Sequence, residues 1–250
     1  MSGSKKSNRP SNFDARGLYQ RLLRAYGQGW WPVVGSKSAP GYDARFEIIL
    51  GAILTQMVAW GNVQKALLNL RAARALSLSK IRSIKISELQ KLIKPTGFYR
   101  QKAKKIKMFI EFLDQDCGGR LDELQAMPVK TLRTKLLSVK GIGEETADSI
   151  ILYAFGKPSF VIDAYTQRLG ALGGLKFSSY GEQQKYFEAR LPRSVKLWRE
   201  YHALIVRWGK DYGRGNKKTS AAAFALLRVR RVRDPFPGGP PTWPSARRSR

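Results

Sequence analysis

An all-α fold is predicted for this chain by three features of its sequence. Apolar residues recur at helical spacing, as in Leu18, Leu22 and Tyr26, which places them on one face of a helix. No series of alternating apolar and polar segments indicates strands. Several prolines fall between the periodic segments or at their starts, where a helix tolerates proline.

The predicted helices follow one another along most of the chain. The first contains Leu18 and Tyr26, and another lies around Leu67 to Leu70, with basic residues turned outward. Further helices are predicted at 43–54, 87–93, 101–114, 129–137, 144–155, 163–169, 180–191 and 195–212. No internal repeat of constant period is present, which argues against a solenoid.

The charge of the chain points to a polyanionic partner. Its 250 residues include 46 Lys and Arg against 18 Asp and Glu, a net charge of +28, while 43% apolar residues suffice for a core. Basic tails that only raise solubility are the alternative. Residues 1–12 and 228–250 account for +9 of the charge, so +19 lies on the rest of the chain. Nucleic acid is therefore the expected partner.

Several classes of protein are excluded by what the sequence lacks. No stretch of about twenty uncharged apolar residues could span a membrane, and the polar N-terminus has no secretory signal. We expect an intracellular protein, cytoplasmic and associated with the nucleoid. The only cysteine, Cys117, excludes an internal disulfide or an all-cysteine metal site, and the only histidine, His202, argues against a multi-histidine zinc site. We therefore expect no metal.

A glycine-rich turn between two predicted helices is the first motif with a chemical meaning. Gly141, Ile142 and Gly143 separate an apolar helix from one that starts at once. Glycine permits positive φ and close backbone approach, and the free N–H groups of the next helix bind anions such as a DNA phosphate. A purely structural helical hairpin is the alternative reading.

An aspartate about twenty residues later is the second motif. Asp163 follows the apolar pair Val161 and Ile162 and opens a predicted helix. Taken alone, it is most simply an N-cap.

Together, the two motifs resemble the helix-hairpin-helix (HhH-GPD) DNA glycosylase superfamily. Segments 52–56, 62–66, 93–103 and 201–209 look like the corresponding segments of endonuclease III, so the resemblance covers residues 14–212. It implies a two-lobed helical fold with a central DNA-binding cleft. One lobe would be 37–157, with the hairpin at 131–156, and the other 14–36 plus 158–212. We expect disordered basic tails at 1–13 and 213–250, the second rich in Pro, Gly and Arg.

The resemblance also implies roles for individual residues. Asp163 would be the catalytic carboxylate, which stabilises positive charge on the deoxyribose as the N-glycosidic bond breaks. Gln56 would fill the gap left by a flipped nucleotide, and Phe98 or Tyr99 would lie on the loop that wedges into the duplex. Lys102 would track phosphates together with its neighbours Lys104, Lys105 and Lys107; a solvated helix face is the alternative for these lysines.

Two departures from endonuclease III change the expected chemistry. Glu145 stands where bifunctional members carry the lysine nucleophile, and a carboxylate cannot form the Schiff base that β-elimination needs. A first-turn acid favoured by the helix dipole is its simpler reading. The four-cysteine iron–sulfur loop is missing after the last helix. Both departures resemble the monofunctional 3-methyladenine DNA glycosylases, and no cofactor is expected.

The base pocket is less well specified by the sequence. An aromatic ring could stack on a cationic alkylated purine, and Trp60, next to the Gln56 segment, is the first candidate. Lys210 and Glu145 are further candidates. Burial in a core is the alternative for each aromatic residue, including Trp30, Trp31, Phe46 and Trp208. Cys117 and His202 are expected to be structural.

The predicted function is hydrolytic removal of damaged, alkylated bases from duplex DNA by a monomeric enzyme. A bifunctional glycosylase and AP lyase acting on oxidised pyrimidines is one alternative. A non-catalytic helix-hairpin-helix DNA-binding protein is the other, although it would not require the Asp163 and Gln56 segments in register.

Overall fold

The computed structural model describes residues 13–28 and 41–212, and within these ranges it contains helices and no strands. The all-α prediction is confirmed. The helices are α1 (Ala15–Tyr26), α2 (Ala44–Leu54), α3 (Trp60–Ala72), α4 (Leu78–Ser83), α5 (Ile86–Leu92), η1 (Lys94–Thr96), α6 (Tyr99–Asp116), α7 (Leu121–Ala126), α8 (Val129–Ser138), α9 (Glu144–Ser149), η2 (Ile150–Ala154), α10 (Ala164–Leu172), α11 (Tyr180–Arg190) and α12 (Val195–Tyr212). None of the described helices is long and apolar enough to cross a membrane.

Local sequence explains where several helices begin. Asp14 caps α1 by accepting a hydrogen bond from Gly17 N at 2.9 Å, and Asp43 caps α2 through Arg45 N at 2.8 Å. These side chains satisfy backbone N–H groups that have no partner in the first turn. The elements α4, η1 and α7 were not predicted, because six residues or fewer give too short a hydrophobic period to recognise.

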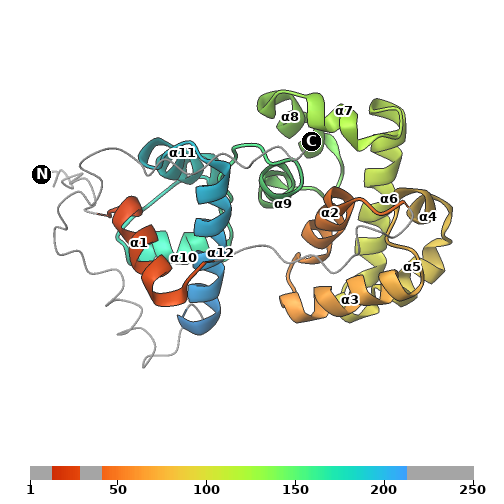
Figure 1. The fold of residues 1–250 in the computed structure, drawn as a ribbon, viewed down its shortest axis with the longest axis horizontal. Coiled ribbons are helices and arrows are strands. Elements are labelled where there is room, and N and C mark those ends of the chain that lie inside the picture. The colour runs from red at the N-terminus through yellow and green to blue at the C-terminus, as the bar shows by residue number, and fades with distance from the viewer. Residues whose placement is uncertain (1–12, 29–40, 213–250) are drawn as a thin grey trace, which may run out of the picture.

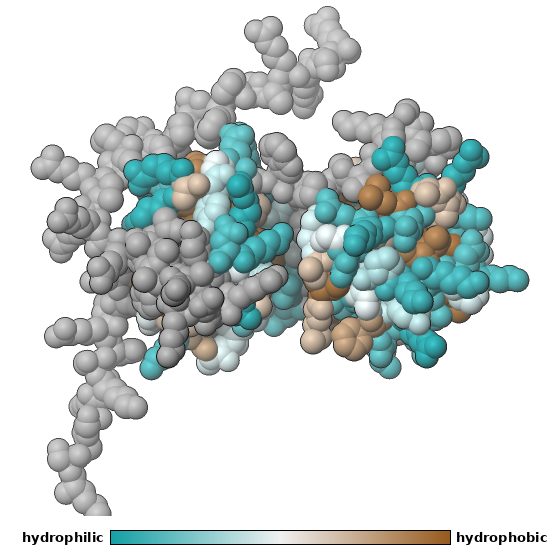
Figure 2. Space-filling view, turned by 90° about the horizontal axis from the view of Figure 1, so that it is seen from below, coloured by the Kyte–Doolittle hydropathy of each residue, from teal (hydrophilic) through white to brown (hydrophobic). Residues whose placement is uncertain are grey.

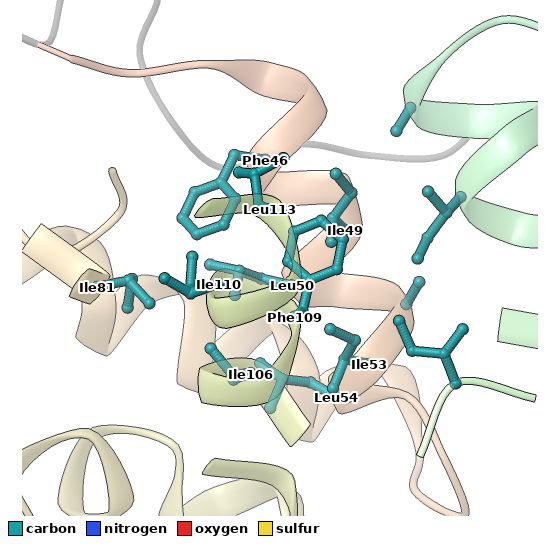
Figure 3. Packing of buried hydrophobic residues seen from close by; sticks show 14 of the residues in the cluster. Phe46, Ile49, Leu50, Ile53, Leu54, Ile81, Ile106, Phe109, Ile110 and Leu113 are labelled. Carbon is teal, nitrogen blue, oxygen red and sulfur yellow. The ribbon is translucent and has the colours of Figure 1, made fainter. Parts of the chain in front are cut away.

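The first hydrophobic core is built around α2 and α6. Phe46, Ile49 and Leu50 of α2 pack against Phe109 and Leu113 of α6, all fully buried (Figure 3). Helices α3, α4, α5, α7, α8 and α9 complete this cluster. Eight of the eleven residues of α2 are buried, as expected of a central helix covered by its neighbours.

The second core joins the two ends of the described chain. Leu18 and Leu22 of α1 pack in one cluster with Tyr201 and Ile205 of α12. The rings of Phe160 and Phe187 stack within it, with centroids 4.9 Å apart. Figure 1 shows α1, α10, α11 and α12 on one side of the molecule, α2 to α8 on the other, and α9 between them.

A π-helix connects the two cores. The predicted helix 144–155 is α-helical only to Ser149 and continues as a π-helix over Ile150–Ala154. Ile150 and Ile151 pack in the first core, whereas Leu152 and Tyr153 pack in the second. The wider turn changes the direction of successive side chains, so one short segment contributes to both cores.

The predicted lobe boundaries and tails stay predictions. Residues 1–12, 29–40 and 213–250 lie outside the described residues, and they include most of both predicted tails and the stretch where the lobe boundary at 36–37 was placed. Trp30 and Trp31 also lie there.

A partly buried ion pair between Arg133 and Asp148 connects α8 to α9. Arg133 donates from Nε to Asp148 Oδ1 at 2.9 Å and from Nη2 to Glu144 Oε1 at 3.2 Å. Asp148 is fully buried and also accepts a hydrogen bond from Ser159 Oγ at 2.6 Å. The nearby carboxylates raise the pKa of the Arg133 guanidinium, so it stays charged.

Asp148→Asn is expected to lower the free energy of unfolding by about 2–3 kcal/mol. Breaking a fully buried pair costs roughly 3–5 kcal/mol, and the Arg133 side chain is partly exposed, which reduces the loss. Glu144→Gln is the matched control on the same guanidinium and should cost less than about 1 kcal/mol, because Glu144 is exposed. Equal losses in urea unfolding would contradict this assignment.

Candidate active site and DNA-binding surface

Asp163 is a buried carboxylate at the start of a helix. It follows the buried residues Val161 and Ile162, and as the N-cap of α10 its Oδ1 accepts hydrogen bonds from Thr166 N at 2.7 Å and Thr166 Oγ1 at 2.8 Å. One oxygen therefore holds the helix end. The cap that the sequence indicated is present, and the second oxygen is directed elsewhere.

That second oxygen faces the only histidine of the chain. Asp163 Oδ2 lies 3.6 Å from Nε2 of His202, whose Nδ1 is 2.7 Å from the hydroxyl of Tyr153. The Tyr153 hydroxyl also lies 3.0 Å from the backbone oxygen of Arg199. Because the Tyr153 hydroxyl donates to that oxygen, it can accept a hydrogen bond from Nδ1–H of the imidazole. Tyr153 therefore orients the ring so that Nε2 lies on the side of the carboxylate.

The interactions of Asp163 with its neighbours favour the charged carboxylate more strongly than burial disfavours it. Burial alone raises the pKa of the Asp163 carboxyl, but His202 and the two hydrogen bonds from Thr166 lower it below its ordinary value. The carboxyl is therefore ionised at neutral pH. A fixed negative charge in surroundings of low dielectric constant can stabilise a developing cation far better than one in water.

The hairpin brings a second carboxylate into this group. Glu145, an exposed residue in the first turn of α9, has its pKa raised, first because neighbouring protein atoms reduce the solvation of the carboxyl and second because of the negative charge on Asp163. The electrostatic effect of His202 lowers the pKa of Glu145 and so partly opposes these two causes. Glu145, Asp163 and His202 thus lie close enough to influence one another electrostatically.

The hairpin turn is anchored on one side and open on the other. Gly141 has a φ of +96°, and a Cβ there would lie 2.7 Å from Cγ of Lys105. Gly143 has open space where a Cβ would stand. Ile142 is buried in the first core, so its part in DNA binding is limited to its backbone. Gly143 and the N–H groups that follow it form the face that a phosphate can approach.

Gln56 is attached to this hairpin. Its Nε2 donates to Gly141 O at 3.1 Å and to Thr146 Oγ1 at 3.0 Å, and Lys105 donates to its Oε1. The side chain therefore has partners at both ends of its amide in the absence of DNA, and its role in filling a gap in the duplex stays a prediction.

The prediction that Lys102 tracks phosphates is wrong. Only 2% of Lys102 is exposed, and its Nζ donates to Leu54 O at 2.9 Å and Thr96 O at 2.8 Å. Burial, with a smaller effect of the charge on Lys105, lowers the pKa of Lys102 to about 8. The Nζ of Lys107 likewise donates hydrogen bonds to three backbone oxygens at the end of α4. Lys104 is exposed, as a phosphate contact requires.

The two wedge candidates are distinguished by their exposure. Phe98 is 62% exposed, whereas Tyr99 packs partly buried against the first core. Phe98 is therefore the residue of this pair that can enter a duplex.

The proposed pocket aromatics among the described residues lie in or against the two hydrophobic cores. Trp60 packs against the first core, and Phe46 and Trp208 are fully buried in the first and second cores. Lys210 is exposed on α12, two turns beyond His202 and therefore roughly 12 Å along the helix. A hollow of about 670 Å³ between α8 and α11 is lined by Lys130, Glu188 and other residues, but not by Asp163.

Sequence reasoning missed the positioning role of three residues. His202 was expected to be structural, and Tyr153 and Thr166 were not singled out. A signal existed for His202, because it is the only histidine and lies in a segment that resembles endonuclease III. The contact of Tyr153 spans 49 residues, and nothing in the local sequence indicates it.

A metal site is not formed by the described residues. They contain no group of three or more His, Cys, Asp or Glu side chains that could hold an ion. Cys117 is 3% exposed in the first core. The four-thiolate cluster of endonuclease III does not fit a chain with one cysteine.

The family follows from comparison with known proteins. The sequence pattern of the HhH-GPD superfamily of base excision DNA repair proteins matches residues 50–193, which include the hairpin and Asp163. The chain belongs to this superfamily. It is 40% identical over 202 residues to "Putative DNA repair glycosylase MJ1434" of Methanocaldococcus jannaschii, covering 79% of this chain and 87% of that protein. Endonuclease III of Thermotoga maritima is 28% identical over 66% of this chain and 73% of its own length.

Solved structures of HhH-GPD proteins share the fold. The H. pylori 3-methyladenine DNA glycosylase MagIII, bound to 1,N6-ethenoadenine, matches with a TM-score of 0.64 at 30% identity, over 78% of this chain and 95% of that one. A non-covalent endonuclease III–DNA complex matches with a TM-score of 0.68 at 20% identity, over 85% and 93% of the two chains. The predicted all-α helix-hairpin-helix glycosylase fold is confirmed, and the chain is a DNA glycosylase of the HhH-GPD family with DNA as its substrate.

Gly143→Val is expected to weaken binding to every duplex about equally, because the added side chain blocks the open face of the hairpin and phosphate contacts carry no sequence information. The fold should change in stability by about 1 kcal/mol or less, since φ at Gly143 is −92°.

Gly141→Val is the contrasting variant. Its strained φ should lower the free energy of unfolding by about 1–3 kcal/mol. Fluorescence anisotropy with undamaged duplexes and urea unfolding measure the two effects. Unchanged duplex affinity in Gly143→Val would show that the hairpin is only structural.

Proposed function

We propose that this glycosylase is monofunctional and removes alkylated bases from duplex DNA by hydrolysis, acting as a monomer inside the cell. The observation that carries the proposal is the group formed by Asp163, Glu145 and His202. It supplies one ionised carboxylate beside the hairpin and a second carboxyl where an amine nucleophile would be needed.

The charge of Asp163 suits the bond-breaking step. As the N-glycosidic bond breaks, positive charge grows on the deoxyribose, and a carboxylate held by Thr166 and His202 is already oriented to stabilise it. A water molecule then adds to the sugar carbon and loses its proton. Asp163 can accept that proton or orient the water.

Alkylated bases suit an enzyme that has no amine at the hairpin. A ring-alkylated purine carries a positive charge and leaves as a neutral base, so it needs little activation. Glu145 has no lone-pair nitrogen to form a Schiff base, and Lys102 is held by two backbone oxygens in the protein interior. The likeness at 30% identity to a 3-methyladenine DNA glycosylase supports the same substrate class.

The bifunctional alternative depends on another lysine. Lys210 is exposed on the helix that carries His202, and relatives named endonuclease III are 28% identical to this chain. Roughly 12 Å of helix separates Lys210 from His202, which favours the monofunctional proposal. We also propose that the enzyme needs no iron–sulfur cluster, because one cysteine supplies one thiolate.

Asp163→Asn is expected to slow release of 3-methyladenine from alkylated duplex by about 30- to 1000-fold, equivalent to about 2–4 kcal/mol of transition-state stabilisation. The asparagine keeps an oxygen for the cap but loses the charge. Asp14→Asn, at the cap of α1, is the matched control and should keep wild-type activity. Single-turnover release measured by mass spectrometry separates the two; wild-type rates in Asp163→Asn would rule out this role.

No covalent complex should form between the wild-type protein and damaged DNA in the presence of borohydride. Strand breaks should appear only after alkali or a separate AP endonuclease, because Glu145 cannot form the imine that borohydride reduces. Denaturing gel electrophoresis detects both products. Efficient trapping that disappears in Lys210→Ala would overturn the proposal and support the bifunctional enzyme.

A further inference from the structure

The hollow of about 670 Å³ lies where the two halves of the molecule meet. Val129 and Lys130 of α8 line one side of it, and Glu188 of α11 and Trp198 of α12 line the other. In Figure 1, α8 belongs to one half of the molecule, and α11 and α12 belong to the other. Asp163 is not part of the lining, so a ligand in this hollow would be distinct from the base that the active site removes.

One wall of the hollow contains a buried donor without an acceptor. Trp198 is 3% exposed, its ring packs edge-on against Phe160 with centroids 6.0 Å apart, and its Nε1 has no hydrogen-bond acceptor among the described residues. A buried N–H group that lacks an acceptor costs free energy and is rare in folded proteins. Because Trp198 lines the hollow, an acceptor that enters this space can approach the donor.

Positive charge predominates in the lining. Lys130 and Arg193 are exposed there, and neither forms an ion pair with another described residue. The third cation, Arg133, is already paired with Asp148 and Glu144. The first turn of α8 has no side-chain cap, so its end adds partial positive charge. The lining therefore favours a ligand with negative charge.

An acceptor in the same lining distinguishes between kinds of anion. Glu188 Oε1 accepts a hydrogen bond from Phe160 N at 2.9 Å, and Oε2 has no donor among the described residues. A peptide offers backbone N–H donors and carbonyl acceptors together with acidic side chains, whereas the DNA backbone has no N–H donor and its phosphates repel a carboxylate. The hairpin also follows the opposite end of α8, a helix of ten residues and thus about 15 Å. An acidic peptide therefore fits better than DNA.

The protein's own chain is poorly suited to this hollow. Residues 1–12, 29–40 and 213–250, which lie outside the described structure, contain several Lys and Arg and a single acidic residue, Asp234. A second copy carries the same net charge of +28 and is repelled at long range. Figure 2 shows hydrophilic side chains over both halves of the molecule on one face, with smaller hydrophobic patches between them. Charge is thus the property by which such a surface selects a partner.

We propose that this hollow binds an acidic segment of a partner protein. Lys130 and Arg193 bind the carboxylates of the segment. Trp198 donates from Nε1 to a backbone carbonyl of the segment, and Glu188 accepts from one of its N–H groups. Tryptophan and arginine are the residues enriched where protein partners meet. This role is independent of base release at Asp163.

The test follows the indole N–H of Trp198 by nitrogen-15 NMR in the full-length protein. Trp198→Phe assigns the signal, and the probe is a blocked pentapeptide of alternating glutamate and leucine. The Trp198 signal should shift saturably, while the signal of Trp208, whose Nε1 is likewise buried without an acceptor in the second core, should not move. The same peptide with glutamine in place of glutamate should bind about tenfold more weakly, because it offers no charge to the cations.

A pair of lysine variants tests the charge contact. Lys130→Gln should weaken binding of the acidic peptide about threefold, as expected for one exposed ion pair. Lys185→Gln removes the same charge from an exposed position of α11 outside the lining and should bind as the wild type does. A Trp198 signal that stays still, equal affinity for the two peptides, or equal weakening in both variants would overturn the proposal. So would a shift caused by undamaged duplex DNA and not by the peptide.

Discussion

A carboxylate that is buried and must remain charged is the constraint on which the site depends. Asp163 is 8% exposed, and an isolated charge at such a position would bind a proton instead. Two hydrogen bonds from Thr166 and the neighbouring His202 keep it ionised, and Tyr153 in turn fixes the orientation of the imidazole. The N-cap of α10 and His202 of α12 therefore act together to keep this carboxylate charged.

The residues of this site come from elements of both hydrophobic cores. Glu145 belongs to α9, whose apolar residues pack in the first core, while Asp163 and His202 lie on elements of the second. The π-helix Ile150–Ala154 contributes side chains to both cores. The hairpin and Asp163 are thus joined by a segment whose residues are buried in both cores.

Local patterns predicted much of this arrangement, and long-range contacts account for what they missed. The long helices, the cap at Asp163 and the turn at Gly141 depend on neighbours in sequence, so they could be read from it. Lys102 looked like part of a basic surface because its acceptors, Leu54 O and Thr96 O, are backbone atoms that no side-chain pattern reveals. The role of His202 depended in the same way on the packing of α12 beside Asp163.

The charge of Asp163 can be observed directly by carbon-13 NMR. The chemical shift of its carboxyl carbon is followed in the full-length protein between pH 8 and pH 5, with Asp163→Asn used to assign the resonance. Because the pKa of Asp163 is lowered below its ordinary value, the shift should be that of an ionised carboxylate over the whole range. A protonated carboxyl at neutral pH, or a midpoint above pH 5, would contradict the electrostatic account of this site.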